Sequence, residues 1–266
     1  RPPRSTLFPY TTLFRSPVVI QDFVTNALML KVGLFQEEKH HNQELGEYLV
    51  QLRGGKFGFN TNEMARQLLE IKDRVYYDQV DWEKLHQEKI NQHPGFDVAH
   101  QAINDYLQEL KKRSLYDFAM LEAEFLDQLK EGKLDDFLEG LKLVLVDEYQ
   151  DSNLLQEQIY FQLARAAINN GGSMTVVGDD DQSLYRFRGA TVDLFTSFQE
   201  RFQQEMPQAP QPRVIYLSQN YRSTGNIVQF CNQFAQLDQE FQEARVRDKP
   251  AIKPERTPPL TEFPIL

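Results

Sequence analysis

The sequence is poor in the residues that mark several common classes of protein. It contains one cysteine, Cys231, which excludes an internal disulfide framework and a cysteine-rich zinc site. No run approaches the roughly 20 apolar residues that cross a bilayer, so no membrane partner is expected. With 29 Lys and Arg against 39 Asp and Glu, the net charge of −10 gives no overall attraction to nucleic acid. Any nucleic-acid contact must be local, and a reducing cytoplasm is the expected setting.

Two ligand-binding patterns are also missing. No G-x-x-x-x-G-K-[ST] loop occurs, and the GGK at residues 54–56 follows a helical pattern and lacks the required glycine spacing. The histidines show no metal-ligand spacing such as H-E-x-x-H, which favours solvated helix positions for all five of them: His40, His41, His86, His93 and His100. The sequence therefore offers no phosphate-cradling loop and no histidine metal motif.

The N-terminal stretch, RPPRSTLFPYTTLFRS, has no periodicity and no signal-peptide architecture. Residues 6–16 resemble the translation of a common short-read sequencing adapter, and the alternative is a disordered N-terminal arm. We favour the artefact because the match is long and unbroken, and we expect residues 1–16 to be disordered. An adapter fused in frame implies that sequence upstream of Pro17 is missing.

A helical region is predicted next. Apolar residues recur at helical spacing over four stretches, residues 41–52, 61–75, 96–112 and 118–129. Asn60 or Thr61 can cap the second helix, and Ser114 with Asp117 resembles a capping box for the fourth. The aromatic and leucine stripes are interpreted as core. We find no chemistry here and expect a helical subdomain.

Alternating strands and helices follow. The run LVLV at residues 143–146 predicts a strand buried on both faces, and residues 174–177 predict a second. Ser152 or Asn153 caps the helix between them. A strand, a helix and a strand within about 35 residues predict a parallel pair with a right-handed crossover.

Three later elements are predicted on the same grounds. A helix opens at Thr191 or Asp193, residues 213–217 (RVIYL) form a third strand, and a helix starts at Ser223 or Thr224.

Adjacent carboxylates, Asp147 and Glu148, follow the first strand directly. In open α/β sheets, ligands collect beyond the carboxyl ends of the strands. One carboxylate can hold Mg²⁺ through its waters while a neighbour accepts a proton from attacking water. Alone, the pair would more simply be surface acids that open the next helix favourably.

Two further polar clusters follow strand ends. The stretch VVGDDDQSLYRFRGA carries Gln182 where its amide can meet a terminal phosphate, then aromatics alternating with arginines. Such rings can stack on unpaired bases, and the arginines can hold phosphates. Tyr221 and Arg222 can stack on adenine and reach phosphate. Buried rings and a turn with a snorkelling arginine are the alternatives. Each cluster is weak alone, but three in this order are specific.

The stretches DEYQDSN, VVGDDDQSLYRFRGA and LSQNYRSTGNI resemble motifs II, III and IV of the UvrD/Rep/PcrA family of superfamily 1 helicases. The resemblance covers residues 116–234. It implies an α/β fold, a partial RecA-like P-loop NTPase domain with a parallel sheet and flanking helices. Residues 114–217 would be the C-terminal half of the first RecA-like domain and 218–266 the truncated start of the second. The helical residues 17–113 would form an insertion-like subdomain.

The resemblance also implies roles at the nucleotide. Asp147 would coordinate the Mg²⁺ of MgATP through water, and Glu148 would activate the hydrolytic water. Gln182 would sense the γ-phosphate. Tyr221 would stack on the adenine, and Arg222 would contact the γ-phosphate as an arginine finger.

Other implied roles concern coupling and DNA. Gln150, with Asp151, would bridge the nucleotide site to neighbouring motifs. Tyr185, Phe187 and Arg188 would contact single-stranded DNA, although family members often have Trp where this chain has Phe187. The implied activity is ATP-driven 3′-to-5′ translocation on single-stranded DNA, used to unwind duplex DNA in repair or replication restart. The implied location is a bacterial-type cytoplasm at the nucleoid, with other repair or replication proteins left open as partners.

The resemblance implies that the parent protein is a helicase. Because the phosphate loop is missing, we expect the 266-residue chain to be inactive alone. A degenerate, non-hydrolysing DNA- or partner-binding module is one alternative, but intact Glu148, Gln182 and Arg222 weigh against it. The helicase part of a RecB/AddA-like helicase–nuclease stays open. A stand-alone nuclease using residues 179–181 is disfavoured, since no nearby pattern completes a two-metal site and acids at turns are commonly structural.

Overall fold

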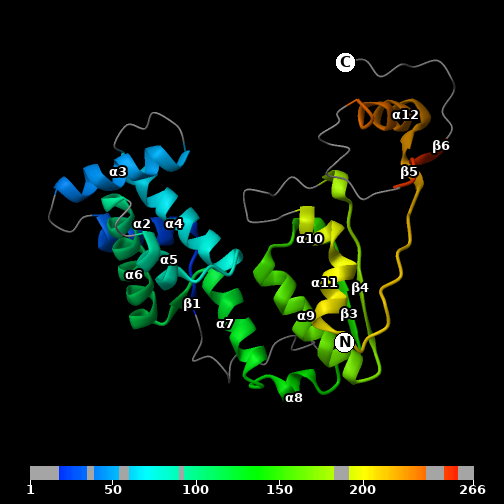
Figure 1. The fold of residues 1–266 in the computed structure, drawn as a ribbon, viewed down its shortest axis with the longest axis horizontal. Helices are drawn as coiled ribbons and strands as arrows, with labels where there is room; N and C mark the ends of the chain where they lie inside the picture. Colours follow the sequence, from blue (N-terminus) through cyan, green and yellow to red (C-terminus); the bar gives the residue numbers. More distant parts are fainter. Residues whose placement is uncertain are drawn as a thin grey trace, which may run out of the picture. The chain divides into compact units, whose positions relative to one another are not determined.

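The computed structural model describes residues 18–34, 39–53, 60–89, 93–182, 192–237 and 249–256. The chain divides into two compact units, Arg1–Leu138 with Asn153–Gln162, and Glu139–Ser152 with Leu163–Leu266 (Figure 1). The described residues are mostly helical, with small sheets of two parallel strands. This confirms an α/β fold in outline, while the domain boundaries stay a prediction.

The first unit is built mainly from helices packed on one another. Its elements are β1 (Val18–Val19), α2 (Asp22–Met29), the π-helical η1 (Leu30–Leu34), α3 (Lys39–Arg53), α4 (Thr61–Tyr77), α5 (Trp82–Lys89), α6 (Pro94–Arg113), β2 (Leu115–Tyr116), α7 (Phe118–Lys130) and α8 (Asp135–Leu138). The Asn60 side chain accepts a hydrogen bond from the Asn62 backbone at 3.0 Å, so the predicted start of α4 is confirmed.

The predicted capping box before α7 is wrong. Asp117 alone caps the helix, because its Oδ1 accepts from the Met120 backbone N–H at 3.0 Å. Ser114 instead ends α6 in the left-handed conformation, with φ 55°. The two residues belong to different helix ends, which sequence spacing cannot distinguish.

The core of this unit lies between the apolar faces of α3, α4 and α6. Leu45, Leu68 and Tyr106 are each 0% exposed there. Leu52 and Phe118, which helical spacing places inward, are 55% and 57% exposed. Both stand at helix ends, and periodicity identifies the face of a helix without saying where its packed neighbour stops.

A buried ion pair joins α4 to the start of α7. The Lys72 Nζ lies 2.5 Å from Asp117 Oδ2, and the Tyr106 hydroxyl donates to the same oxygen at 3.0 Å. The Lys72 side chain is 2% exposed and also pairs with the more exposed Asp73. Burial raises the pKa of Tyr106, and the Asp117 charge raises it further. The hydroxyl therefore stays a donor to the carboxylate.

Not all histidines occupy the solvated positions expected of them. His100 is 7% exposed, and the His93 side chain accepts from the Gly95 backbone N–H at 3.1 Å at the start of α6. The expectation is wrong for His100 because α5, which the sequence did not reveal, packs against α6.

The second unit begins with a parallel strand pair. Its elements, together with α9 (Leu154–Asn169), which the unit boundary divides, are β3 (Leu143–Val146), η2 (Tyr149–Asp151), β4 (Ser173–Val176), η3 (Asp180–Gln182), α10 (Val192–Thr196), α11 (Phe198–Glu205), β5 (Gln219–Thr224), α12 (Gly225–Phe234) and β6 (Lys253–Arg256). β3 and β4 pair in parallel with Val146 opposite Val176, which confirms the predicted strand–helix–strand unit. The Asn153 Oδ1 accepts from the Gln156 backbone at 2.9 Å and caps α9.

β3 is buried on one face only, so the prediction of two buried faces is wrong. Val144 and Val146 are 7% and 8% exposed, whereas Leu143 and Leu145 are 53% and 68% exposed. A strand is buried on both faces only where layers cover both sides of the sheet. The residues that the structure describes cover one side of β3.

The predicted strand at residues 213–217 is also wrong. These residues are irregular, and Ile215 and Leu217 are 68% and 82% exposed. Strand propensity expresses fit to a pleated, paired surface, and the next pairing along the chain is that of β5 with β6. α12 follows Thr224 as predicted, but Val228 is its one buried residue.

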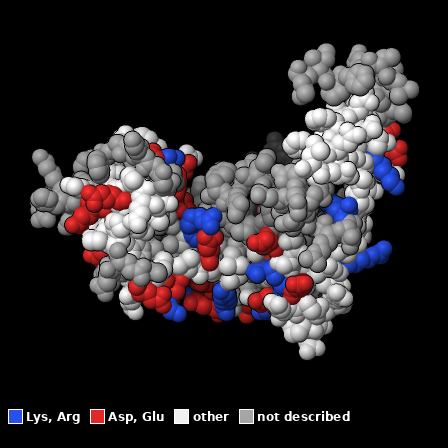
Figure 2. All heavy atoms as spheres, turned by 45° about the horizontal axis from the view of Figure 1, so that its top comes forward, with Lys and Arg blue, Asp and Glu red and all other residues white. Residues whose placement is uncertain are grey.

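Charged side chains of both signs share the described surface. On the face shown in Figure 2, Lys and Arg gather in separate small groups among Asp and Glu. This pattern agrees with the net charge of −10 and with local rather than general attraction to nucleic acid. Across the described ranges, no helix is both long and apolar enough to cross a membrane.

Replacing Asp117 by Asn should lower the free energy of unfolding of this chain by about 3–5 kcal/mol, because a buried ammonium loses its buried partner. Urea denaturation followed by circular dichroism measures the change. Asp136→Asn, on the exposed surface of α8, is the matched control and should stay within about 0.5 kcal/mol. Equal midpoints for Asp117→Asn and the parent chain would contradict the assigned role.

Candidate functional site

The ends of β3 and β4 meet at one edge of their sheet, as predicted. Asp147 and Glu148 follow β3 and are exposed, and residues 179–182 follow β4. Backbone pairing continues beyond the strands, where the Tyr149 N–H donates to the Val177 carbonyl at 3.0 Å. Two of the three predicted polar clusters are therefore held side by side by backbone hydrogen bonds.

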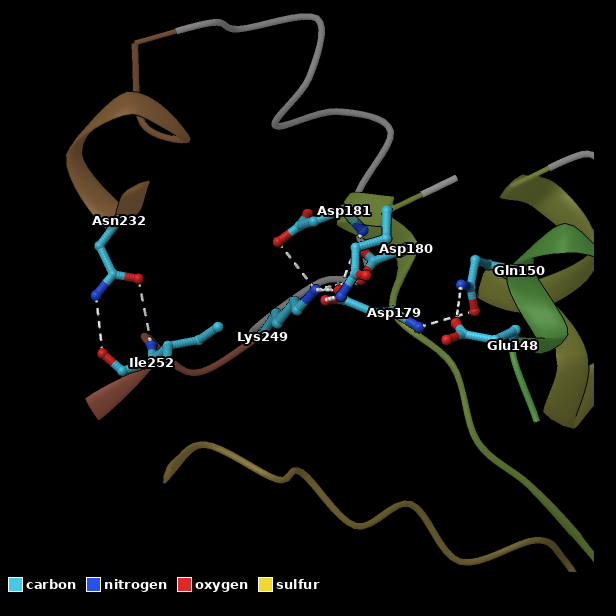
Figure 3. Close-up of polar contacts among 9 residues, drawn as sticks. Glu148, Gln150, Asp179, Asp180, Asp181, Asn232, Lys249 and Ile252 are labelled. Atoms are coloured by element: carbon cyan, nitrogen blue, oxygen red, sulfur yellow. Dashed lines mark hydrogen bonds and ion pairs between the residues drawn. The ribbon is translucent and has the colours of Figure 1, made fainter. Parts of the chain in front are cut away.

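A chain of hydrogen bonds links these two clusters through Gln150, which is 1% exposed (Figure 3). The Gln150 Nε2 donates to Glu148 Oε2 at 2.6 Å, and its Oε1 accepts from the Asp179 backbone N–H at 3.0 Å. The Gln182 Nε2 then donates to Asp179 Oδ2 at 2.6 Å. Both polar groups of one buried amide are thus used to connect Glu148 to Gln182.

Gly178 makes room for this buried amide. A Cβ at this position would lie 2.5 Å from Gln150 Oε1 and 2.8 Å from the Phe195 ring. Since such contacts are far inside van der Waals range, a side chain at Gly178 would push the amide away from Asp179. The glycine of the stretch VVGDDD is therefore required by packing at the edge.

Glu148 has an unusual backbone conformation that turns the chain at the end of β3. Its φ of 51° and ψ of 44° lie in the left-handed region, which costs a non-glycine residue roughly 1–3 kcal/mol. Its N–H donates to Asp147 Oδ1 at 3.0 Å. The next side chain, Tyr149, is 0% exposed and packs edge-on against Phe198 at 5.1 Å. Anchoring of Tyr149 leaves the Glu148 carboxylate at the surface.

The apolar cover over Tyr149 is formed by two short helices. α10 and α11 bury Leu194 and Phe202, two residues of the inward face expected for this segment. The expected single helix is divided at Ser197. The division lets both Phe195 and Phe198 approach the tyrosine ring.

Lys249 binds all three aspartates that follow β4. Its Nζ lies 2.6 Å from Asp179, 2.5 Å from Asp180 and 3.0 Å from Asp181, between the side chains in Figure 3. Sequence reasoning missed this lysine, because it stands before Pro250 in a polar stretch without a motif. The three carboxylates could by spacing group around a metal ion, but here they surround an ammonium group.

Lys249 affects the ionisation of Asp179 at this edge. Burial alone would raise the pKa of Asp179, but hydrogen bonds from Lys249 and Gln182 outweigh it and hold that pKa below its ordinary value. Burial alone would lower the pKa of Lys249, whereas its bonds to the aspartates raise it. Burial also raises the pKa of Asp151, with a smaller contribution from the Glu148 charge. Asp179 therefore stays an acceptor for the Gln182 amide.

The remaining predicted site residues are not joined to this network by the contacts above. Tyr221 and Arg222 lie exposed on β5, where the Tyr221 hydroxyl donates to Gln219 Oε1 at 2.7 Å. Their roles at a nucleotide stay predictions. The predicted DNA contacts fall outside the described residues: Tyr185, Phe187 and Arg188.

Comparison with known proteins gives a consistent result. The family described as the UvrD/REP helicase N-terminal domain matches residues 19–203. A relative from Carboxydothermus hydrogenoformans, named as a subunit of an ATP-dependent helicase/nuclease, is 29% identical over 217 residues, which is 75% of this chain and 17% of that protein.

Shorter matches include two proteins named as helicases. The "ATP-dependent DNA helicase PcrA" of Bacillus subtilis is 36% identical, over 48% of this chain and 16% of that protein. The "ATP-dependent DNA helicase Rep" of Buchnera aphidicola is 34% identical, over 46% of this chain and 17% of that protein. The chain thus spans a small part of each relative's length.

Replacing Lys249 by Met should raise the pKa of Asp179, because burial then acts without the opposing ammonium. Carbon-13 NMR titration of the aspartate carboxyl groups measures this shift, and Lys253→Met, at an exposed position on β6, is the control.

Since the folded-state pKa of Asp179 is depressed, the contribution of the ion pair to stability is present above the ordinary aspartate pKa of 3.8 and is lost as pH falls through the folded-state value. The stability difference between the parent and Lys249→Met should therefore be full at neutral pH and shrink in acid. An unchanged Asp179 titration would refute the assignment.

Proposed function

Because this chain belongs to the UvrD/REP helicase N-terminal domain family, we propose that it is part of an ATP-dependent DNA translocase and that the β3–β4 edge is half of its MgATP site. The hydrogen-bonded path from Glu148 through Gln150 and Asp179 to Gln182 carries the proposal. It connects a carboxylate suited to activate water with an amide suited to meet a phosphate, and it does so through a buried side chain.

The oxygen donors at the end of β3 fit a hard divalent cation. Asp147 is exposed, and its Oδ1 accepts from the Glu148 N–H, which fixes the carboxylate at the edge of the sheet. Carboxylate oxygen and water are the ligands that Mg²⁺ prefers, and the ion neutralises phosphate charge when bound. We assign Asp147 to hold Mg²⁺ through water, and Glu148 to accept the proton of the attacking water.

The buried amide supplies the coupling. A displacement of residues 179–182 moves Gln182 and, through Gln150, the Glu148 carboxylate. In the proposal, Tyr185, Phe187 and Arg188 bind single-stranded DNA just beyond Gln182 in the sequence. DNA binding would then move the Glu148 carboxylate through side chains that are already hydrogen-bonded to one another.

We assign β5 to bind the nucleotide on the side away from the β3–β4 edge. Tyr221, exposed there, would stack on adenine, and Arg222 would reach the γ-phosphate. An arginine finger contributes about 10³–10⁵ in rate in related phosphoryl transfer. Closure of β5 onto the β3–β4 edge would complete the site.

In this proposal β3, α9 and β4 belong to a first RecA-like domain, residues 218–266 begin a second, and the helical unit is an insertion-like subdomain. The whole protein would translocate 3′-to-5′ along single-stranded DNA in repair or replication restart. The 266 residues contain no G-x-x-x-x-G-K-[ST] sequence, so the chain alone should not turn over MgATP.

A helicase–nuclease parent is the second candidate. The match to the relative whose name includes both helicase and nuclease extends over 75% of this chain, compared with 48% for the PcrA relative. A degenerate binding module is less favoured, since the connection between Glu148 and Gln182 is intact.

In the full-length protein, Glu148→Gln should lower DNA-stimulated ATP hydrolysis by about 10²–10⁴-fold and spare ATP binding, because the amide cannot accept the proton. A coupled ATPase assay and equilibrium binding of a fluorescent ATP analogue separate the two effects. Glu139→Gln, exposed just before β3, should leave both unchanged. Turnover that survives in Glu148→Gln would remove the proposed base.

Phe187→Ala in the full-length protein should weaken single-stranded DNA binding by about 1–3 kcal/mol through loss of base stacking. Fluorescence anisotropy with a labelled oligonucleotide measures the affinity. Phe23→Ala, at a side chain 85% exposed on α2, controls for loss of a surface aromatic ring. Unchanged affinity would assign Phe187 to packing instead.

A further inference from the structure

A group of imidazoles and carboxylates lies between α5 and α6, within the first unit. The rings of His86 and His100 stack with their centroids 3.7 Å apart and an interplanar angle of 8°. Glu83 Oε1 lies 3.3 Å from His100 Nε2, and Asp97 Oδ1 lies 2.8 Å from His86 Nε2. Two residues from each helix therefore meet at one place that plays no part in the β3–β4 edge.

We propose that Glu83, His86 and His100 bind a Zn²⁺ ion that fastens α5 to α6. Each residue offers one ligand atom, and these atoms all lie within 4.8 Å of one another. Zinc takes imidazole nitrogen and carboxylate oxygen at about 2.0–2.2 Å, so the two stacked rings must turn out of their parallel arrangement for all three donors to reach one ion. A water molecule completes the tetrahedron.

Asp97 is the outer partner of this site. A histidine that binds a metal through one ring nitrogen commonly donates from the other to a carboxylate, which fixes the ring orientation and tautomer. The 2.8 Å contact between Asp97 and His86 has this form. The carboxylate also adds negative charge beside the cation.

The surroundings give the site a rigid wall and an opening. Trp82 stacks on His100 with centroids 5.3 Å apart, and Phe96 meets the Trp82 ring edge-on at 5.4 Å. By contrast, the side chains of Glu83 and Asp97 are 67% and 57% exposed. An ion can therefore enter from the carboxylate side, which is open to solvent.

A structural role follows from the length of α5. The helix has eight residues, and helices this short are marginal without packing or other support. Glu83 and His86 are on α5 and His100 is on α6, so one ion crosslinks the two helices. Zinc should therefore stabilise the folded chain itself, independently of nucleotide or DNA.

The test uses the 266-residue chain, stripped with a chelator and titrated with Zn²⁺ by isothermal calorimetry and thermal unfolding. We expect one high-affinity site and a rise in melting temperature. At free zinc 100 times the dissociation constant, the folding equilibrium should shift about 100-fold toward the folded state. Absence of a saturable site, or an unchanged melting temperature, would overturn the proposal.

Variants locate the ion. Glu83→Gln and His86→Gln, both with solvent-accessible side chains, should each remove the zinc-induced rise in melting temperature, and Asp97→Asn should weaken zinc binding about 10–100-fold. The matched control, Glu88→Gln, changes an exposed carboxylate of α5 outside the cluster and should bind zinc as the parent does. A second control, His40→Asn with His41→Asn, tests the adjacent histidine pair. Zinc binding that survives Glu83→Gln and His86→Gln but is lost in the second control would place the ion elsewhere and refute the site.

Discussion

Parallel pairing of β3 with β4 is the constraint on which the candidate site depends. Because the strands run in the same direction and in register, Asp147 and Glu148 end up beside residues 179–182, although α9 separates them in the sequence. The pairing alone would leave two acidic turns side by side. The buried Gln150 amide converts that proximity into a connection, since it uses its donor on one turn and its acceptor on the other.

Charge at this edge is balanced from a distant part of the chain. Lys249 brings an ammonium group to residues 179–181, which would otherwise be a concentration of negative charge close to a proposed phosphate site. The lysine keeps Asp179 ionised and able to hold the Gln182 amide. Electrostatics and hydrogen bonding at the edge are therefore coupled, and neither can be understood from motif residues alone.

The helical unit is held together by contacts of a different kind from those at the β3–β4 edge. Its described residues pack an apolar core that encloses the ion pair of Lys72 with Asp117, and a second polar cluster joins α5 to α6 near the surface. Neither feature contributes a group to the β3–β4 edge. A family assignment based on the helicase motifs consequently says little about what the polar clusters of this unit do.

By itself, the sequence determined the family, the parallel strand–helix–strand unit, and two adjacent candidates for each of two helix caps, because motif order, apolar periodicity and capping chemistry are local properties. The structure chose Asn60 and Asn153 from these candidates. The resemblance also implied that Gln150 bridges the nucleotide site to neighbouring motifs, and this role stays a prediction. Tertiary structure alone decided that β3 has one covered face and that residues 213–217 form no strand, since burial and pairing depend on neighbours far along the chain. The same holds for the left-handed conformation of Glu148, the ion pairs of Lys249 and the stacking of His86 on His100. Each requires groups without a fixed sequence spacing to meet in space.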